Sequence, residues 1–245
     1  MTLLSGRADD IRTLLEAADP GAVWAVGGPE GADGGSGAAD RDLDVGGLTA
    51  VLAVWPVIGS LVDEGALRLH TPLAAYGPEA ADGLPAPTTA HHLLTHAQDP
   101  AVTALTRLAE HLGGRPLAEL AATRVWHPLG MTRTRFDDGT LRTRLADLTR
   151  FPCRLLAPAD ADPPGITRSW TAESLRIRTG ELTPARGLLW HPAPHGVWGC
   201  QGRAGGPGLW LAPRLGRWAV LVPDRGRDPL PAAFREAAFT PLPAR

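Results

Sequence analysis

The sequence predicts an α+β protein, in which a mainly antiparallel sheet is flanked by helices from both ends of the chain and interrupted by a helical region. Two observations carry this prediction. Apolar residues recur at helical spacing near the N-terminus and through the middle of the chain, whereas the C-terminal part alternates or runs apolar in short segments typical of strands. A last helical segment, residues 231–238, closes the chain.

The first half of the chain is expected to be mostly helical. The spacing of apolar side chains predicts helices over five segments: 8–18, 48–62, 87–96, 102–112 and 116–125. Thr88 or Thr89 supplies the N-cap of the third of these helices. A short buried strand is predicted at 22–26, and residues 29–40, rich in Gly, Ala and Asp, are expected to form a loop.

The second half changes its hydrophobic period. It predicts a helix over 141–156 that is interrupted near Pro152, followed by strands at three segments: 187–190, 208–212 and 218–222. A turn of hairpin length separates the last two strands. We therefore expect one continuous structural unit, in which residues 1–46 and 165–245 form the sheet part and residues 47–164 form the helical part.

Composition excludes several classes of function. All 24 basic residues are arginine, which excludes lysine Schiff bases and a lysine general base. The net charge of −2 argues against nucleic-acid binding, and the longest apolar run, 51–61, is too short to span a membrane. No signal peptide is recognisable at the N-terminus, so we expect a cytoplasmic protein with Cys153 and Cys200 as free thiols. No cofactor is expected, and the Arg, Ala, Gly and Pro usage is of the actinobacterial type.

A framework of short motifs runs through most of the chain. Its segments are Asp44–Ala50, Leu61–Leu67, Thr71–Leu73, His91–His96, Gly114–Leu117, His127–Phe136 and Gly208–Pro213. In this order they resemble the serine β-lactamase and penicillin-binding-protein-like hydrolases, especially the class C β-lactamase and esterase branch. The resemblance implies a β-lactamase/transpeptidase-like fold.

The same resemblance places the family's catalytic positions on residues that lack the functional groups needed for catalysis. The nucleophilic serine falls on Gly47, and the lysine three residues later falls on Ala50. The tyrosine of the second motif falls on Ala97, and the third motif falls on Cys200-Gln201-Gly202, of which only the glycine is kept. Loss of a general base costs on the order of 10²–10⁴ in rate, but loss of the nucleophile removes the acyl-enzyme route itself.

None of the chain's serines lies in a nucleophile framework. They are Ser5, Ser36, Ser60, Ser169 and Ser174. We therefore expect no classical serine β-lactamase, peptidase or esterase activity.

The degenerate site still offers candidate ligand contacts. Unpaired amide groups at the helix start, at Gly47, Leu48 and Thr49, are suited to a carboxylate or carbonyl group. Asp99, Gln201 and Gly202 complete the candidate binding set. The alternative interpretation is that Gly47 is only the remnant of a lost serine, and that Thr49 is a spacer facing away.

Two weak catalytic candidates remain, each with a structural alternative. Cys200 would be a nucleophile if a neighbouring cation lowered its pKa, but a buried inert thiol is the competing interpretation. Asp99 would serve as an acid or base, or simply as a helix N-cap. His92 and His96 have the i, i+4 spacing of metal ligands, but no third ligand is evident and no metal is predicted.

These observations predict a β-lactamase-like pseudoenzyme that has lost acyl-serine catalysis and binds a small acyl or carboxylate ligand or a protein partner. The alternative is a repurposed, non-hydrolytic enzyme of specialised metabolism, of the cyclisation or isomerisation type. A third and weaker possibility is a hydrolase with a relocated nucleophile. Neither nucleic acid nor membrane is expected as a partner, and no oligomeric state is predicted.

Overall fold

The computed structural model describes residues 3–37, 40–96, 99–158, 165–180, 184–225 and 229–240, and the side chains from Arg7 onward. The chain forms two compact units. The first, the sheet unit, comprises residues 1–48, 131–158 and 193–245. The second, the helical unit, comprises residues 49–130 and 159–192.

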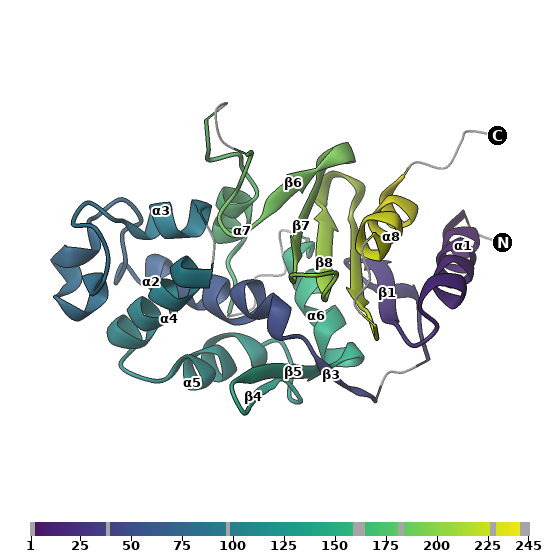
Figure 1. Cartoon of the computed structure of the whole chain (residues 1–245), viewed down its shortest axis with the longest axis horizontal. Helices are drawn as coiled ribbons and strands as arrows, with labels where there is room; N and C mark the ends of the chain where they lie inside the picture. The colour runs from purple at the N-terminus through teal and green to yellow at the C-terminus, as the bar shows by residue number, and fades with distance from the viewer. Residues whose placement is uncertain are drawn as a thin grey trace. The chain divides into compact units, whose positions relative to one another are not determined.

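The sheet unit is built on a six-stranded sheet with the strand order β2-β1-β9-β8-β7-β6, in which β2, β1, β9, β8 and β7 pair antiparallel. Figure 1 shows β7 and β8 side by side in this sheet. Its strands are β1 (Val23–Gly28), β2 (Gly31–Gly35), β6 (His191–Ala193), β7 (Val197–Gln201), β8 (Gly208–Ala212) and β9 (Arg217–Val222). The strands β1, β8 and β9 consist almost entirely of buried residues. This agrees with the apolar runs that predicted them, and the predicted α+β class with a mainly antiparallel sheet is confirmed.

Helices cover both faces of this sheet. On one face, α1 (Leu3–Ala18) packs beside α8 (Leu230–Phe239), and Ile11 and Phe234 join Trp24 and Trp210 of the sheet in one buried core. Buried Arg7 ties the two terminal helices together, since its guanidinium donates to the carbonyl of Ala238 at 2.6 Å. The other face is covered by α6 (Leu145–Leu155), which contacts β1, β2 and β9.

A second, three-stranded sheet completes this unit, in the order β3-β5-β4. Its strands are β3 (Asp42–Asp44), β4 (Arg135–Asp137) and β5 (Thr140–Arg144), and the short 3₁₀ turn η1 (Gly46–Leu48) follows β3. The prediction of a helix over the whole of 141–156 is therefore wrong at its start. Buried Leu141 and Thr143 alternate with half-buried arginines, a period of two that suits a strand rather than a helix.

The helical unit is organised around a long apolar helix. The unit contains η2 (Ala50–Val54), α2 (Trp55–Asp63), η3 (Leu73–Tyr76), η4 (Glu79–Ala81), α3 (Ala90–Thr95), α4 (Asp99–Gly113), α5 (Leu117–Ala121), η5 (Ala122–Trp126) and α7 (Arg168–Ser174). The segment η2 is a turn of π-helix that continues directly into α2. Because Pro56 has no N–H to donate to the carbonyl of Leu52, that carbonyl instead accepts from Trp126 Nε1 at 2.8 Å.

Three tryptophans lock α7 onto this long helix. Trp55 Nε1 donates to Ser174 Oγ at 2.8 Å, and Trp170 Nε1 donates to the carbonyl of Trp55 at 3.1 Å. The Trp55 and Trp190 rings meet edge to face, with 5.8 Å between their centroids. Trp190, at the end of the segment predicted as a strand at 187–190, thus belongs to the helical unit.

Two other local predictions are corrected by the structure. Residues 31–35 form the edge strand β2 rather than part of a loop, because they pair with β1. Residues 187–190 do not form a strand. The Gly187 N–H donates to the carbonyl of Trp190 at 2.7 Å, and Leu189 takes a positive φ of 65°, so this segment is a tight turn.

The two units divide the chain at other points than the expected 46/47 and 164/165. Residues 131–158 group with the sheet unit because β5 pairs with β3 and α6 packs on the six-stranded sheet. Residues 165–192, which include the first two residues of β6, group with the helical unit, because α7 is bonded to Trp55. None of the helices in the described part of the chain has the length and apolar character needed to cross a bilayer.

Candidate functional site

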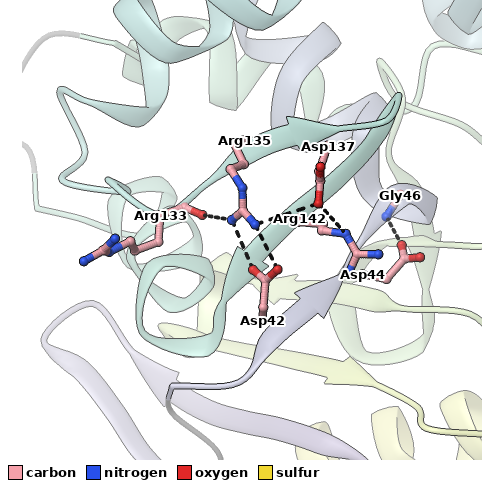
Figure 2. A network of polar contacts seen from close by, with 7 residues as sticks. All are labelled: Asp42, Asp44, Gly46, Arg133, Arg135, Asp137 and Arg142. Atoms are coloured by element: carbon pink, nitrogen blue, oxygen red, sulfur yellow. Dashed lines mark hydrogen bonds and ion pairs between the residues drawn. The ribbon is translucent and has the colours of Figure 1, made fainter.

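The strand β3, which leads into Gly47, is fixed by a network of charged side chains (Figure 2). Asp42 accepts a bidentate pair of hydrogen bonds from Arg135, at 3.2 and 3.0 Å. Three residues before Gly47, at the end of β3, the Asp44 carboxylate accepts a hydrogen bond from the N–H of Gly46 at 2.9 Å. These bonds anchor the segment that leads into Gly47 to the three-stranded sheet.

Gly47, where the resemblance places the nucleophile, lies directly against the end of β7. A Cβ atom built on Gly47 would lie only 2.8 Å from Cα of Gly202, and 3.3 Å from Cγ and Cδ of Pro207. Real Cβ atoms do not approach another carbon so closely, and the atom in the way belongs to the backbone. A serine at position 47 therefore requires the chain around Gly202 to move.

The chain around Gly202 is itself held in place by a tight hairpin connection. The N–H of Gly202 donates to the carbonyl of Pro207 at 2.8 Å, and the N–H of Gly206 donates to the carbonyl of Arg203 at 2.9 Å. Between them Ala204 takes a positive φ of 50°, a backbone conformation that residues other than glycine rarely adopt. The turn closing this hairpin leaves the backbone at Gly202 little freedom to retreat from Gly47.

Amide groups near the helix start are already used by the chain. Gly46 donates to Asp44, and the N–H of Leu48 donates to the carbonyl of Val45 at 2.8 Å. The side chain of Leu48 is fully buried, whereas Gly47 is exposed. The turn η1 is only three residues long, and two of its N–H groups already have acceptors within the chain. It therefore has fewer N–H groups left for a ligand than the helix start predicted from the sequence.

Cys200 lies near the end of β7, opposite Leu209 of β8. The thiol is buried, and loss of its hydration raises the pKa of Cys200 to about 12. A thiol with this pKa stays protonated at neutral pH and lacks the thiolate form that a nucleophile needs. Its neighbour Gln201 is exposed and ends the strand. The other cysteine, Cys153, is also free and donates to the carbonyl of Gly28 at 3.5 Å.

The remaining predicted site residues belong to the helical unit or lie outside the described residues. Thr49 has helical backbone angles and makes no capping hydrogen bond with its side chain, and half-buried Ala50 begins the π-helical turn. Asp99 is exposed and is the first residue of α4. Ala97 lies outside the described residues. The structure thus brings Gly47 together with Gly202, with Cys200 two residues before it on β7.

The histidine pair of α3 has structural roles. His92 Nδ1 accepts from the N–H of Thr89, and the His92 N–H donates to Thr89 Oγ1 at 3.2 Å, which makes a reciprocal cap at the helix start. His96 Nδ1 lies 3.1 Å from the carbonyl of His92. In the part of the chain that the structure describes, no three His, Cys, Asp or Glu side chains are grouped as a metal site requires.

Serine hydroxyls in the described residues make structural hydrogen bonds. Ser60 Oγ donates to the carbonyl of Val57 at 2.8 Å and accepts from Arg124 at 3.0 Å. Ser174 accepts from Trp55, and Ser36 Oγ accepts from the N–H of Trp24 at 3.3 Å. Ser169 Oγ lies 3.1 Å from Thr167 Oγ1. None of these partners is a general base.

Sequence reasoning missed Pro207, whose ring atoms fill the space beside Gly47. The only signal was the glycine-rich stretch 202–208, which allows a close approach of two backbones, but nothing in it names the segment that approaches. The contact between residues 47 and 202 joins parts of the chain that are far apart in sequence. It could be found only in the folded structure.

No protein-family model and no curated protein sequence matches this chain. Solved structures do match. A β-lactamase from Mycobacterium bovis is 20% identical and aligns over 93% of this chain and 99% of its own, with a TM-score of 0.70. An octameric penicillin-binding protein homologue from Pyrococcus abyssi is 15% identical and aligns over 97% and 77%, with a TM-score of 0.74. A family VIII carboxylesterase is 12% identical and aligns over 97% of both chains, with a TM-score of 0.77.

These likenesses extend over nearly the whole chain and agree with the antiparallel sheet, the two terminal helices and the helical unit described above. At such identities they establish the fold and not the activity. The fold expected from the motif framework is thereby confirmed: this chain has the fold of the serine β-lactamases and penicillin-binding proteins.

Proposed function

We propose that this chain is a non-catalytic protein on the serine β-lactamase fold, and that it acts by binding a protein partner. The observation that carries the proposal is the contact of Gly47 with Gly202, which leaves no room for a side chain at the nucleophile's position. Acyl-enzyme chemistry needs a hydroxyl or thiol at this place and a base beside it. Here the chain has a glycine, and the lysine position is Ala50.

Three further observations support the loss of catalysis. The Cys200 thiol is held protonated by burial, which raises its pKa to about 12. The described serine hydroxyls are engaged in structural hydrogen bonds rather than paired with a general base. Lysine is absent from the whole sequence, so no lysine elsewhere can take over the role of the base.

A protein partner is favoured over a small acyl or carboxylate ligand at Gly47. Of the amide groups predicted to hold such a ligand, that of Leu48 already donates to the carbonyl of Val45, and the adjacent N–H of Gly46 donates to Asp44. A binding role therefore has to use another surface of the protein.

The test is covalent labelling. The purified protein is incubated with a fluorescent penicillin, a chromogenic cephalosporin and a chromogenic ester, and its intact mass is measured for acyl adducts. We expect no adduct and no turnover above the rate without protein. Turnover that is lost in Cys200→Ala or Asp99→Ala would overturn the proposal and favour the repurposed enzyme. Turnover that is lost in a serine-to-alanine variant would favour a relocated nucleophile.

A matched pair of variants tests the carrying observation. Gly47→Ser with Ala50→Lys restores the two lost groups, and Gly47→Ala with Ala50→Lys adds the same crowding without a hydroxyl. Because the Cβ atom collides with Gly202 in both, we expect neither to be acylated. Rapid acylation of the serine variant alone would mean that the site has kept an open catalytic geometry.

A further inference from the structure

The edge strand β2 is almost free of side chains. It consists of Gly31, Ala32, Asp33, Gly34 and Gly35, and within the described residues it pairs only with β1. Such an unpaired edge offers its outward N–H and C=O groups to another strand.

The regular part of this edge is its C-terminal half. The pairing with β1 is interrupted by a bulge between Val26 and Gly27, but Gly35 lies opposite Ala25 and the N–H of Ser36 donates to the carbonyl of Trp24 at 2.9 Å. In an antiparallel pair, residues alternate between facing the partner and facing away. Because Ser36 faces β1, Gly35 directs its N–H and C=O to the open edge.

An open cavity lies on the α6 side of this edge. It has a volume of about 320 Å³ and is lined by β2 together with Ala25, Leu145, Ala146 and Thr149. Most of its wall area is apolar, and Asp33, Ser36 and Thr149 are the polar residues that line it. The cavity exists because β2 carries no side chain large enough to fill the space between itself and α6.

A second open cavity lies on the α1 side of the same edge. It has a volume of about 300 Å³, and its wall includes Arg12, Glu16, Asp19, Trp24 and Gly35. Arg12 is ion-paired with Asp9 at 2.9 Å. The carboxylates of Glu16 and Asp19 therefore give the cavity an excess of negative charge.

Asp19 adds to this negative character because it is only 1% exposed. Its Oδ2 accepts from the N–H groups of Asp224 and Arg225, at 2.9 and 3.2 Å. Its Oδ1 has no hydrogen-bond partner among the described residues. A buried carboxylate oxygen without a donor favours the arrival of a cationic group nearby.

We propose that the β2 edge binds an extended segment of a partner protein as an additional strand. One apolar side chain of the segment would enter the cavity beside α6, and a neighbouring lysine or arginine would enter the acidic cavity beside α1. The alternation follows from strand geometry, since successive side chains point to opposite faces of a sheet. This inference rests on the proposed binding function and names its surface and the kind of partner.

A second copy of this chain fits the edge poorly. Its own β2 would bring only glycine, alanine and Asp33, which fill neither cavity and add negative charge beside Glu16. The charge of the cavity beside α1 and the apolar wall of the cavity beside α6 both favour a segment of another protein with alternating apolar and basic residues.

A capped peptide, acetyl-Thr-Val-Arg-Val-Thr-amide, serves as the probe. Its binding to the full chain is followed by NMR shift changes of the β2 backbone amides at low and high salt. We expect binding that weakens with salt, is about tenfold weaker when glutamate replaces the peptide's arginine, and is lost when the two valine nitrogens are methylated. A methylated peptide that binds equally well would overturn strand addition.

Variants of the chain locate the two side-chain contacts. Ala146→Phe fills the cavity beside α6 from an exposed helix position, and Ala17→Phe on α1 is its matched control. Glu16→Gln removes a charge from the acidic cavity, and Glu236→Gln on α8 is its matched control. We expect at least tenfold weaker binding for the first member of each pair and no change for the second.

Two results would contradict the proposal. Binding that none of these variants affects would show that the peptide binds elsewhere. A dimer in light scattering that dissociates in Ala146→Phe would make a second copy the occupant of the edge. Labelling by the fluorescent penicillin is measured on the same samples. A failure of the catalytic proposal is thus detected separately from a failure of peptide binding.

Discussion

Gly47 and Gly202 face each other so closely that a Cβ atom on Gly47 would lie 2.8 Å from Cα of Gly202. The sequence resemblance places these two glycines in the first and third catalytic motifs of the family. In this chain they form a backbone contact where the resemblance places a nucleophile. The close approach of the β7–β8 connection thus suits a glycine at position 47 and leaves no space for a serine side chain unless the backbone moves.

The first prediction concerns this contact. Gly47→Ala and Gly47→Ser should each lower the free energy of unfolding by about 1–3 kcal/mol, because a methyl or hydroxymethyl group overpacks against backbone that the hairpin turn holds in place. Urea denaturation measures the effect. Gly37→Ala, where an added Cβ has no atom within 4 Å, is the control and should change little. Equal stability of all these variants would mean that the contact is loose.

The second prediction concerns Trp210, whose indole covers two glycines of the sheet. A Cβ on Gly199 would lie 2.3 Å from Cδ1 of Trp210, and one on Gly208 would lie 2.1 Å from Cη2. Gly199→Ala should destabilise the protein by about 1–3 kcal/mol, and by less in a Trp210→Leu background. The double-mutant cycle should give a coupling energy of about 0.5–3 kcal/mol. Additive effects would exclude direct packing of the ring on Gly199.

The third prediction concerns the buried thiol. Burial raises the pKa of Cys200 to about 12, whereas the unfolded chain ionises its thiols near pH 8.5. The stability linked to Cys200 is thus complete below about pH 8.5 and falls as pH rises toward 12, with a slope of at most about 1.4 kcal/mol per pH unit. Denaturation curves from pH 8 to 11 measure this slope. Cys200→Ala should flatten it, whereas Cys153→Ala should keep most of it.

Alkylation gives an independent check on the same thiol. In native protein at pH 8, iodoacetamide should modify Cys153 before Cys200, because Cys153 is only half-buried. Rapid modification of Cys200 in mass spectra of native protein would contradict its assignment as an inert thiol.

The fourth prediction concerns acid stability of the helical unit. Burial, and then the charges of His70, Arg178, His92 and His96, lower the pKa of His91, whose ring stacks on His70 with 4.6 Å between centroids. Because the pKa of His91 is lower in the folded protein, this histidine takes up its proton in the unfolded chain at a higher pH than in the folded one. Stability should therefore be complete above about pH 6.5 and decrease as pH falls below it.

Thermal unfolding between pH 7 and pH 5 measures this decrease. His91→Gln should make the melting temperature less dependent on pH, and His127→Gln, at an exposed position, should not. An unchanged pH dependence in His91→Gln would assign the acid sensitivity to other groups.

The sequence by itself determined the fold class, and it predicted which residues stand at the family's catalytic positions. Apolar periodicity located the long helix that begins near Gly47, and apolar runs located β1, β8 and β9, because these patterns depend on local geometry and burial. The family's spacing then placed Gly47 and Ala50 where a serine and a lysine are expected. Both conclusions follow from residue identity and need no knowledge of which segments touch.

Tertiary structure decided everything that depends on segments far apart in the chain. The contact of Gly47 with Gly202, and the burial that raises the pKa of Cys200, result from the packing of β7 and its hairpin. The glycine-rich β2 has no strand-like pattern of its own and becomes a strand only because β1 pairs with it. Local sequence carries the propensity of a segment, but pairing partners, close backbone contacts and desolvation exist only once the chain has folded.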